Sequence, residues 1–109
     1  MSSLDRLGQD RRSAAIASGV IDLYGAAVQV LTTSGAAAFS LTGQADGRHQ
    51  TVMIRVQASG ANITPSFPAG WVWSTATPVS LTDGNEAVLT ITSHGSTDAE
   101  VIAGWVEVA

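Results

Sequence analysis

Cysteine is absent from the chain, and its absence excludes several kinds of site together. Without thiols the protein has no disulfide framework, no cysteine-bound zinc and no thiolate nucleophile. Lysine is absent as well: the five cations are all arginine, they stand against nine acidic residues, and the formal net charge is -4. A sparsely charged, acidic chain repels the phosphates of nucleic acid and of anionic lipid. We therefore expect neither nucleic acid nor a membrane as a partner.

Long apolar runs are also missing. No segment approaches the roughly 18 consecutive apolar residues of a membrane-spanning helix, and residues 1–6 lack the apolar run of a signal peptide. We expect a soluble chain without a targeting segment. Its 109 residues correspond to about one domain, which is long enough to bury a core without metal or disulfide support.

Residues 1–18 differ in character from the rest of the chain. A short helix beginning near Ser2 is cut off by Gly8, and charge gathers over Asp10–Ser13. We predict an N-terminal arm over residues 1–18 and a β domain over residues 19–109. The arm is either a frayed terminus or a segment that docks on a neighbouring subunit or a larger surface. In the second interpretation the attachment residues are Leu4, Arg6, Leu7, Arg11 and Arg12.

From Val20 onward apolar residues recur at every second position, which is the period of β-strands. The clearest strand is Gln50–Ser59, and Pro65 and Pro78 argue against central strands at their own positions. Turn signals separate about seven short strands; they lie at Thr32–Gly35, Gln44–Arg48, Gly60–Asn62, Asp83–Asn85 and Ser93–Ser96. This pattern predicts an all-β fold, a small antiparallel β-sandwich or jelly roll.

The last predicted strand, Ala99–Val108, is apolar on both faces. Trp105 shares one face with Val101 and Ala103, while the other face presents Ile102, Val106 and Val108. Because a strand of a small domain normally has one side in water, a second apolar side indicates a contact with another sheet or another subunit. Met53 and Val88, on nominally outer faces of their own strands, favour the same conclusion. We expect a homo-oligomer.

The segment Phe67–Trp73 concentrates two of the three tryptophans. Pro68 cannot donate to a β-ladder and Gly70 favours a turn, so we expect a strand to end at Phe67 and the chain to change direction. Trp71 and Trp73, two positions apart, then share one face. We interpret Phe67, Trp71, Trp73 and Trp105 as packing residues of the core or of a subunit contact. The alternative is that exposed indoles stack on sugar rings.

The chain resembles the terminal β-sandwich modules of bacteriophage tail fibres and related virion surface proteins over about residues 36–106. The resemblance lies in Leu41–Gln44, Val52–Val56, Phe67–Trp73 with the loop up to Pro78, and Ala87–Thr90 with Trp105. It implies a homotrimer in which the aromatic residues pack. The chain departs from the family pattern at Val72 and Ser74–Thr75, and the shaft of a tail fibre is missing ahead of the module.

These features favour a capsid decoration protein or short head fibre on the virion surface, made in the host cytoplasm. Its expected partners are copies of itself and virion proteins such as the major capsid protein. The alternative is a tail-fibre tip or baseplate module that binds a host receptor or surface glycan.

Enzyme motifs are weak in this sequence. Ser93, His94 and Asp98 contain the letters of a catalytic triad but lie in one short stretch, and no Gly-x-Ser-x-Gly motif accompanies them. His49 and His94 stand in separate turns without thiols or clustered carboxylates, so we interpret them as ordinary loop residues. Asp83, Glu86, Asp98 and Glu100 are the candidates for the paired carboxylates of glycoside hydrolysis. Turns and strand starts explain their presence equally well, because solvated charge is common there. We predict no enzyme activity, no catalytic residue, no metal site and no cofactor.

Overall fold

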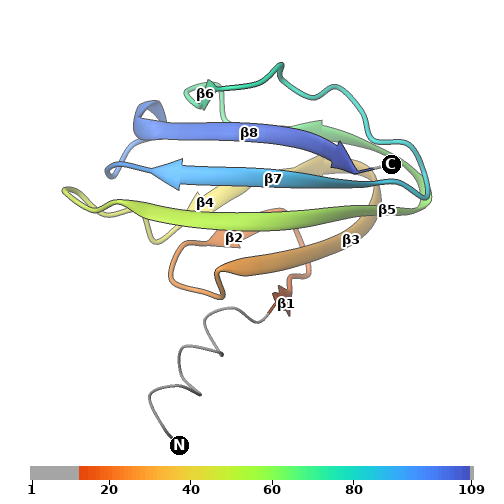
Figure 1. Cartoon of the computed structure of the whole chain (residues 1–109), viewed down its shortest axis with the longest axis horizontal. Coiled ribbons are helices and arrows are strands. Elements are labelled where there is room, and N and C mark those ends of the chain that lie inside the picture. Colours follow the sequence, from red (N-terminus) through yellow and green to blue (C-terminus); the bar gives the residue numbers. More distant parts are fainter. Residues whose placement is uncertain (1–12, 109) are drawn as a thin grey trace, which may run out of the picture.

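The computed structural model describes residues 13–108, and their regular structure is almost entirely β-strand. This confirms the predicted all-β class. The strands are β1 (Ser13–Ala15), β2 (Val20–Asp22), β3 (Val28–Ala38), β4 (Ser40–Thr42), β5 (Gln50–Ser66), β6 (Val72–Trp73), β7 (Glu86–Ser93) and β8 (Val101–Val108) (Figure 1). One turn of 3-10 helix, η1 (Asp98–Glu100), precedes β8. Within residues 13–108 no helix has the length and apolarity needed to cross a bilayer.

The main sheet has six strands in the order β1-β3-β5-β7-β8-β6, and β2 and β4 form a separate pair. Only the β5–β7 and β7–β8 pairs are antiparallel. The β1–β3, β3–β5, β6–β8 and β2–β4 pairs are parallel. The predicted purely antiparallel arrangement is therefore wrong, because both sheets contain parallel pairs and the main sheet is mixed.

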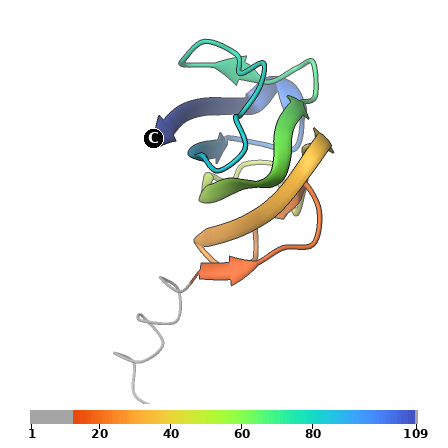
Figure 2. The same cartoon turned by 90° about the vertical axis from the view of Figure 1, so that its right-hand side faces the viewer.

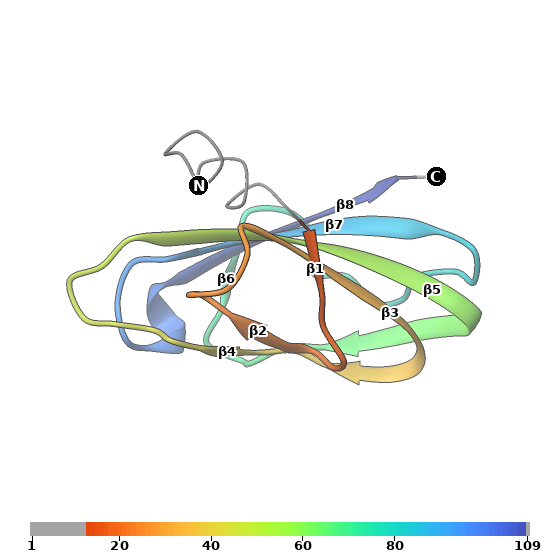
Figure 3. The same ribbon diagram turned by 90° about the horizontal axis from the view of Figure 1, so that it is seen from below.

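Both β3 and β5 bend where the sequence predicted turns. Gly35 and Gly60 have φ angles of 75° and 98°, a region that favours glycine, and the β3–β5 register shifts between Thr33 and Gly35. Figures 2 and 3 show both strands curving away from the main sheet and returning on the opposite side of the molecule. After the bend in β3 the chain enters β5 in the same direction, which makes the β3–β5 pair parallel, whereas β7 runs antiparallel to β5. Thr32–Gly35 and Gly60–Asn62 are thus irregular stretches inside continuous strands.

The core lies between the main sheet and these returning segments (Figure 3). Alternation along β5, β7 and β8 is as predicted: one face of each strand is buried and the other is half-buried or exposed. The returning side adds fully or almost fully buried side chains, namely Ile21, Phe39, Ile63 and Leu81. The turn predicted at Asp83–Asn85 is confirmed, since the Asn85 N–H donates to the Thr82 carbonyl over 2.9 Å and Gly84 has a φ of 86°.

The described part of the predicted arm joins the main sheet. β1 pairs with β3 from Ser13↔Val28 to Ala15↔Val30, and the Ile16 N–H donates to the Val30 carbonyl over 2.8 Å. The predicted attachment residues lie outside the described residues; they are Leu4, Arg6, Leu7, Arg11 and Arg12.

Candidate binding pocket at the aromatic corner

The aromatic corner, residues 67–73, forms where β5 ends. β5 stops at Ser66, one residue before the predicted end, and a turn follows in which the Trp71 N–H donates to the Pro68 carbonyl over 3.2 Å. The chain then enters β6, whose Trp73 pairs in register with Ala103 of β8. Because β6 is held by β8, the corner is fixed to the edge of the main sheet.

Phe67 is the centre of an aromatic cluster. Its ring stacks on Phe39 with the centroids 5.2 Å apart and meets Trp73 edge to face at 4.7 Å. Trp71 and Trp105 lie 5.7 and 6.2 Å from the same ring. These are the separations of favourable aromatic pairs. The sequence predicted packing roles for Phe67 and the three tryptophans, and the structure brings all four together.

The members of the cluster differ in their exposure to solvent. Trp71 and Trp105 retain only 5% and 8% of their accessible surface, and the Trp71 indole N–H donates to an Asp98 carboxylate oxygen over 3.3 Å. Phe67 and Trp73 are only partly buried. Trp71 and Trp105 therefore belong to the core of the single chain, while Trp73 and Phe67 expose part of their rings to solvent.

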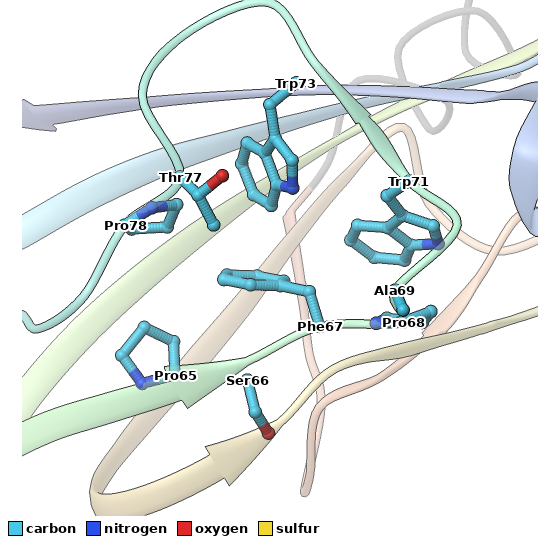
Figure 4. A pocket seen from close by; sticks show the side chains of 9 residues that line it. All are labelled: Pro65, Ser66, Phe67, Pro68, Ala69, Trp71, Trp73, Thr77 and Pro78. Atoms are coloured by element: carbon cyan, nitrogen blue, oxygen red, sulfur yellow. The ribbon is translucent and has the colours of Figure 1, made fainter.

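This ring surface borders a cavity of about 420 Å³. Three aromatic rings and three proline rings dominate its lining, which consists of Pro65, Ser66, Phe67, Pro68, Ala69, Trp71, Trp73, Thr77 and Pro78 (Figure 4). Figure 4 shows Trp73 and Phe67 beside the space that Pro65 and Pro78 border. A cavity of this size with flat apolar walls and a few hydroxyl groups suits a small ligand with a flat apolar face. Among residues 13–108, no acidic, basic or histidine side chain lines it.

The loop that closes one side of the cavity is tied to β8 at its start. The Ser74 N–H donates to the Ala103 carbonyl over 2.8 Å, and the Thr75 hydroxyl accepts the Trp105 N–H over 3.0 Å. In the sequence, the loop up to Pro78 contributes to the resemblance, but no pocket was predicted beside it. Pro78 together with a second proline, Pro65, was the available signal.

Met53 and Val88, the other predicted contact residues, lie away from the corner on the outer face of the main sheet. We use "outer face" for the outward-pointing apolar side chains of this sheet: Val28, Val30, Met53, Val88, Ile102, Val106 and Val108. The strand register joins Val28 to Met53 and Val88 to Val106. Four of these side chains, namely Met53, Ile102, Val106 and Val108, are between 41% and 61% exposed.

An ion pair of Arg55 and Glu86 interrupts the outer face. Arg55 donates to a Glu86 carboxylate oxygen over 2.8 Å, and the Gln57 side-chain amide donates to the same oxygen over 2.7 Å. The hydrogen bond from Gln57, followed by that from Arg55, holds the pKa of the Glu86 carboxyl below its ordinary value. The charges of Arg55 and Glu86 are thus paired with each other within one chain.

The residues considered as catalytic candidates form hydrogen bonds with neighbouring groups instead. The Ser93 hydroxyl is buried and donates to the Gly95 carbonyl over 2.9 Å, while His94 contacts His49 and Asp98 accepts from Trp71. Of the remaining candidate carboxylates, Asp83 accepts a hydrogen bond from the Gly60 N–H and Glu100 accepts one from the Thr97 N–H. Glu86 is in the ion pair described above. Each of these groups has a structural partner in a turn or on the sheet.

The described residues form a small all-β fold with a pocket lined by aromatic and proline rings. Comparison with family models, with curated proteins and with solved structures finds no match. The resemblance to virion surface modules consequently rests on the residues quoted for it in the sequence.

Proposed function

We propose that the chain is a bacteriophage virion structural protein, a capsid decoration protein or short head fibre. In this proposal three copies associate, the main sheet and the returning strands of each form a β-sandwich, and the N-terminal arm attaches the trimer to the particle. The observation that supports it best is the outer face, which places several exposed apolar side chains on one side of the main sheet, around the Arg55–Glu86 ion pair.

The outer face has the character of a subunit interface. Val88 and Val106 are direct cross-strand neighbours. On β5 the direct neighbour of Val88 is Arg55, and Met53 lies diagonally across from Val88, opposite Thr90. Next to Gly104, which has no side chain, lies a hollow of about 290 Å³ bordered by Ile102 and Val106. Such a hollow accepts a side chain of a second copy. Apolar patches with charge satisfied internally are typical of contacts between protein subunits.

Attachment to the particle is assigned to the arm. A decoration protein that binds the assembled shell but not the loose subunits stabilises the shell by mass action. The test is removal of residues 2–12, which keeps β1 and its pairing with β3 intact. We expect the truncated protein to keep its oligomeric state and to lose co-sedimentation with particles that lack the native protein. Full occupancy of particles by the truncated protein would refute the role of the arm.

A second candidate function is supported by the pocket. Trp73 and Phe67 are only partly buried in a cavity of about 420 Å³, which suits stacking of a sugar ring as in a tail-fibre tip that binds a host glycan. Binding of the isolated protein to an array of bacterial surface glycans tests this function. Electron microscopy of the particle, with the protein labelled, separates the two candidates by placing it on the head or the tail.

A further inference from the structure

The chain has only two histidines, and they meet at one end of the main sheet. His49 directly precedes β5 and His94 directly follows β7. The antiparallel register that ends at Gln50↔Ser93 continues to these two residues, so they face each other as a cross-strand pair. Their Nδ1 atoms form a hydrogen bond of 2.8 Å, in which one ring donates and the other accepts, and the ring centroids are 4.9 Å apart at an interplanar angle of 78°. The contact was not predicted, because 44 residues separate the two histidines along the chain.

The separation of the two nitrogens matches that of two ligands on one metal ion. With metal–nitrogen bonds of about 2.0 to 2.1 Å, ligands at a right angle are about 2.9 Å apart, and tetrahedral ligands are about 3.4 Å apart. The observed 2.8 Å fits the right-angle arrangement of octahedral or square-planar ions and needs an opening of only about half an ångström for zinc. Both side chains are exposed, so small rotations reach either geometry.

We propose that His49 and His94 bind one late first-row divalent transition metal ion, Cu²⁺, Ni²⁺ or Zn²⁺, through their Nδ1 atoms. Imidazole is a preferred ligand of these ions, whereas Mg²⁺ and Ca²⁺ require oxygen ligands. Among residues 13–108 no third histidine, aspartate or glutamate completes a cluster of ligands around the pair. Water, or a group from a second copy, therefore occupies the remaining coordination positions. This departs from the sequence-based interpretation of the two histidines as unrelated loop residues.

The backbone holds the pair in place. The His94 N–H donates to the Glu100 carbonyl over 2.9 Å, which ties the start of the β7–β8 loop to η1. His49 is adjacent to Arg48, but the Arg48 guanidinium is directed to Tyr24, donating to its hydroxyl over 3.0 Å and lying over its ring. The nearest cation in the sequence is thus engaged elsewhere, and a metal ion bound to both Nδ1 atoms would replace the hydrogen bond between the two imidazoles.

Calorimetric titration of chelator-treated full-length protein with CuCl₂, NiCl₂ and ZnCl₂ tests the proposal, with MgCl₂ as the ion that should not bind. We expect no more than one ion per chain and the tightest binding for Cu²⁺. His49→Gln and His94→Gln should each lower the affinity by roughly tenfold or more. Ser96→Ala, an exposed change in the same loop as His94, should leave it unchanged. Circular dichroism checks that each variant is folded.

Nitrogen NMR of the imidazoles identifies the binding atoms, because the chain gives signals from two histidines only. On addition of Zn²⁺ both Nδ1 resonances should shift together and saturate at the calorimetric equivalence point. The proposal is overturned by absence of binding at millimolar metal, by metallation of Nε2 with two independent ions per chain, or by wild-type affinity in either single variant.

Discussion

Replacing Val106 by aspartate should dissociate the proposed trimer. Val106 is 61% exposed in the isolated chain and lies opposite Val88 on the outer face. Burying that fraction of a valine side chain contributes about 1 to 2 kcal/mol per protomer. Three copies lose about 3 to 6 kcal/mol, which is roughly a 10²- to 10⁴-fold rise in the trimer dissociation constant. The carboxylate adds a desolvation cost of several kcal/mol per buried charge.

Val79→Asp is the matched control for this change. Val79 is 79% exposed, but it lies in the loop after β6, away from the outer face. We expect sedimentation equilibrium at micromolar concentrations to give a trimer for the wild type and Val79→Asp, and a monomer with unchanged circular dichroism for Val106→Asp. A monomeric wild type, a trimeric Val106→Asp, or equal dissociation of both variants would refute the outer face as the subunit contact.

Three further predictions concern the pocket, the bent strands and the ion pair. Trp73→Ala should weaken glycan binding by roughly tenfold or more and lower stability less than Trp71→Ala, because Trp73 is only partly buried. Trp71→Ala should lower the unfolding free energy by about 3 to 5 kcal/mol. Array binding and urea denaturation distinguish the two variants. Gly60→Ala should lower the free energy of unfolding, measured by urea denaturation, by about 1 to 2 kcal/mol. The cause is the positive φ of Gly60 alone, since a Cβ there meets no neighbour. Ser59→Ala should leave this free energy nearly unchanged. The lowered folded-state pKa of Glu86 stabilises the fold above the ordinary glutamate pKa, and this contribution is lost as pH falls through the lower folded-state value; Glu86→Gln should flatten that part of the acid unfolding curve.

Periodicity in the sequence predicted which side chains of β5, β7 and β8 are buried, because burial depends on the face of a strand and every second residue shares a face. Periodicity could not predict which strands pair with each other or whether the pairs are parallel or antiparallel. Gly35 and Gly60 look like turn glycines, yet each lies where a strand bends and continues. Whether a glycine reverses a strand or bends it depends on what the chain packs against afterwards, which is a long-range property.

The aromatic corner was predictable and the pocket beside it was not. Phe67, Trp71 and Trp73 are close in sequence, so their meeting required only a turn. Pro78 reaches the cavity because the loop before it is tied to β8 by Thr75, and no local pattern encodes that hydrogen bond. The same holds for the two histidines, whose contact follows from the β5–β7 register.

The outer face and the pocket share no residue, and this separation bears on how the two candidate functions relate. A trimer formed through Val88 and Val106 leaves the cavity at Phe67 and Trp73 uncovered by that contact. Each particle-bound trimer then presents three copies of the pocket, and weak binding of one sugar becomes strong for a surface that offers many. Loss of trimerisation in Val106→Asp should therefore reduce binding to a glycan-coated surface while leaving the affinity for the free glycan unchanged. If both fall together, the pocket depends on the subunit contact and the two surfaces are not independent.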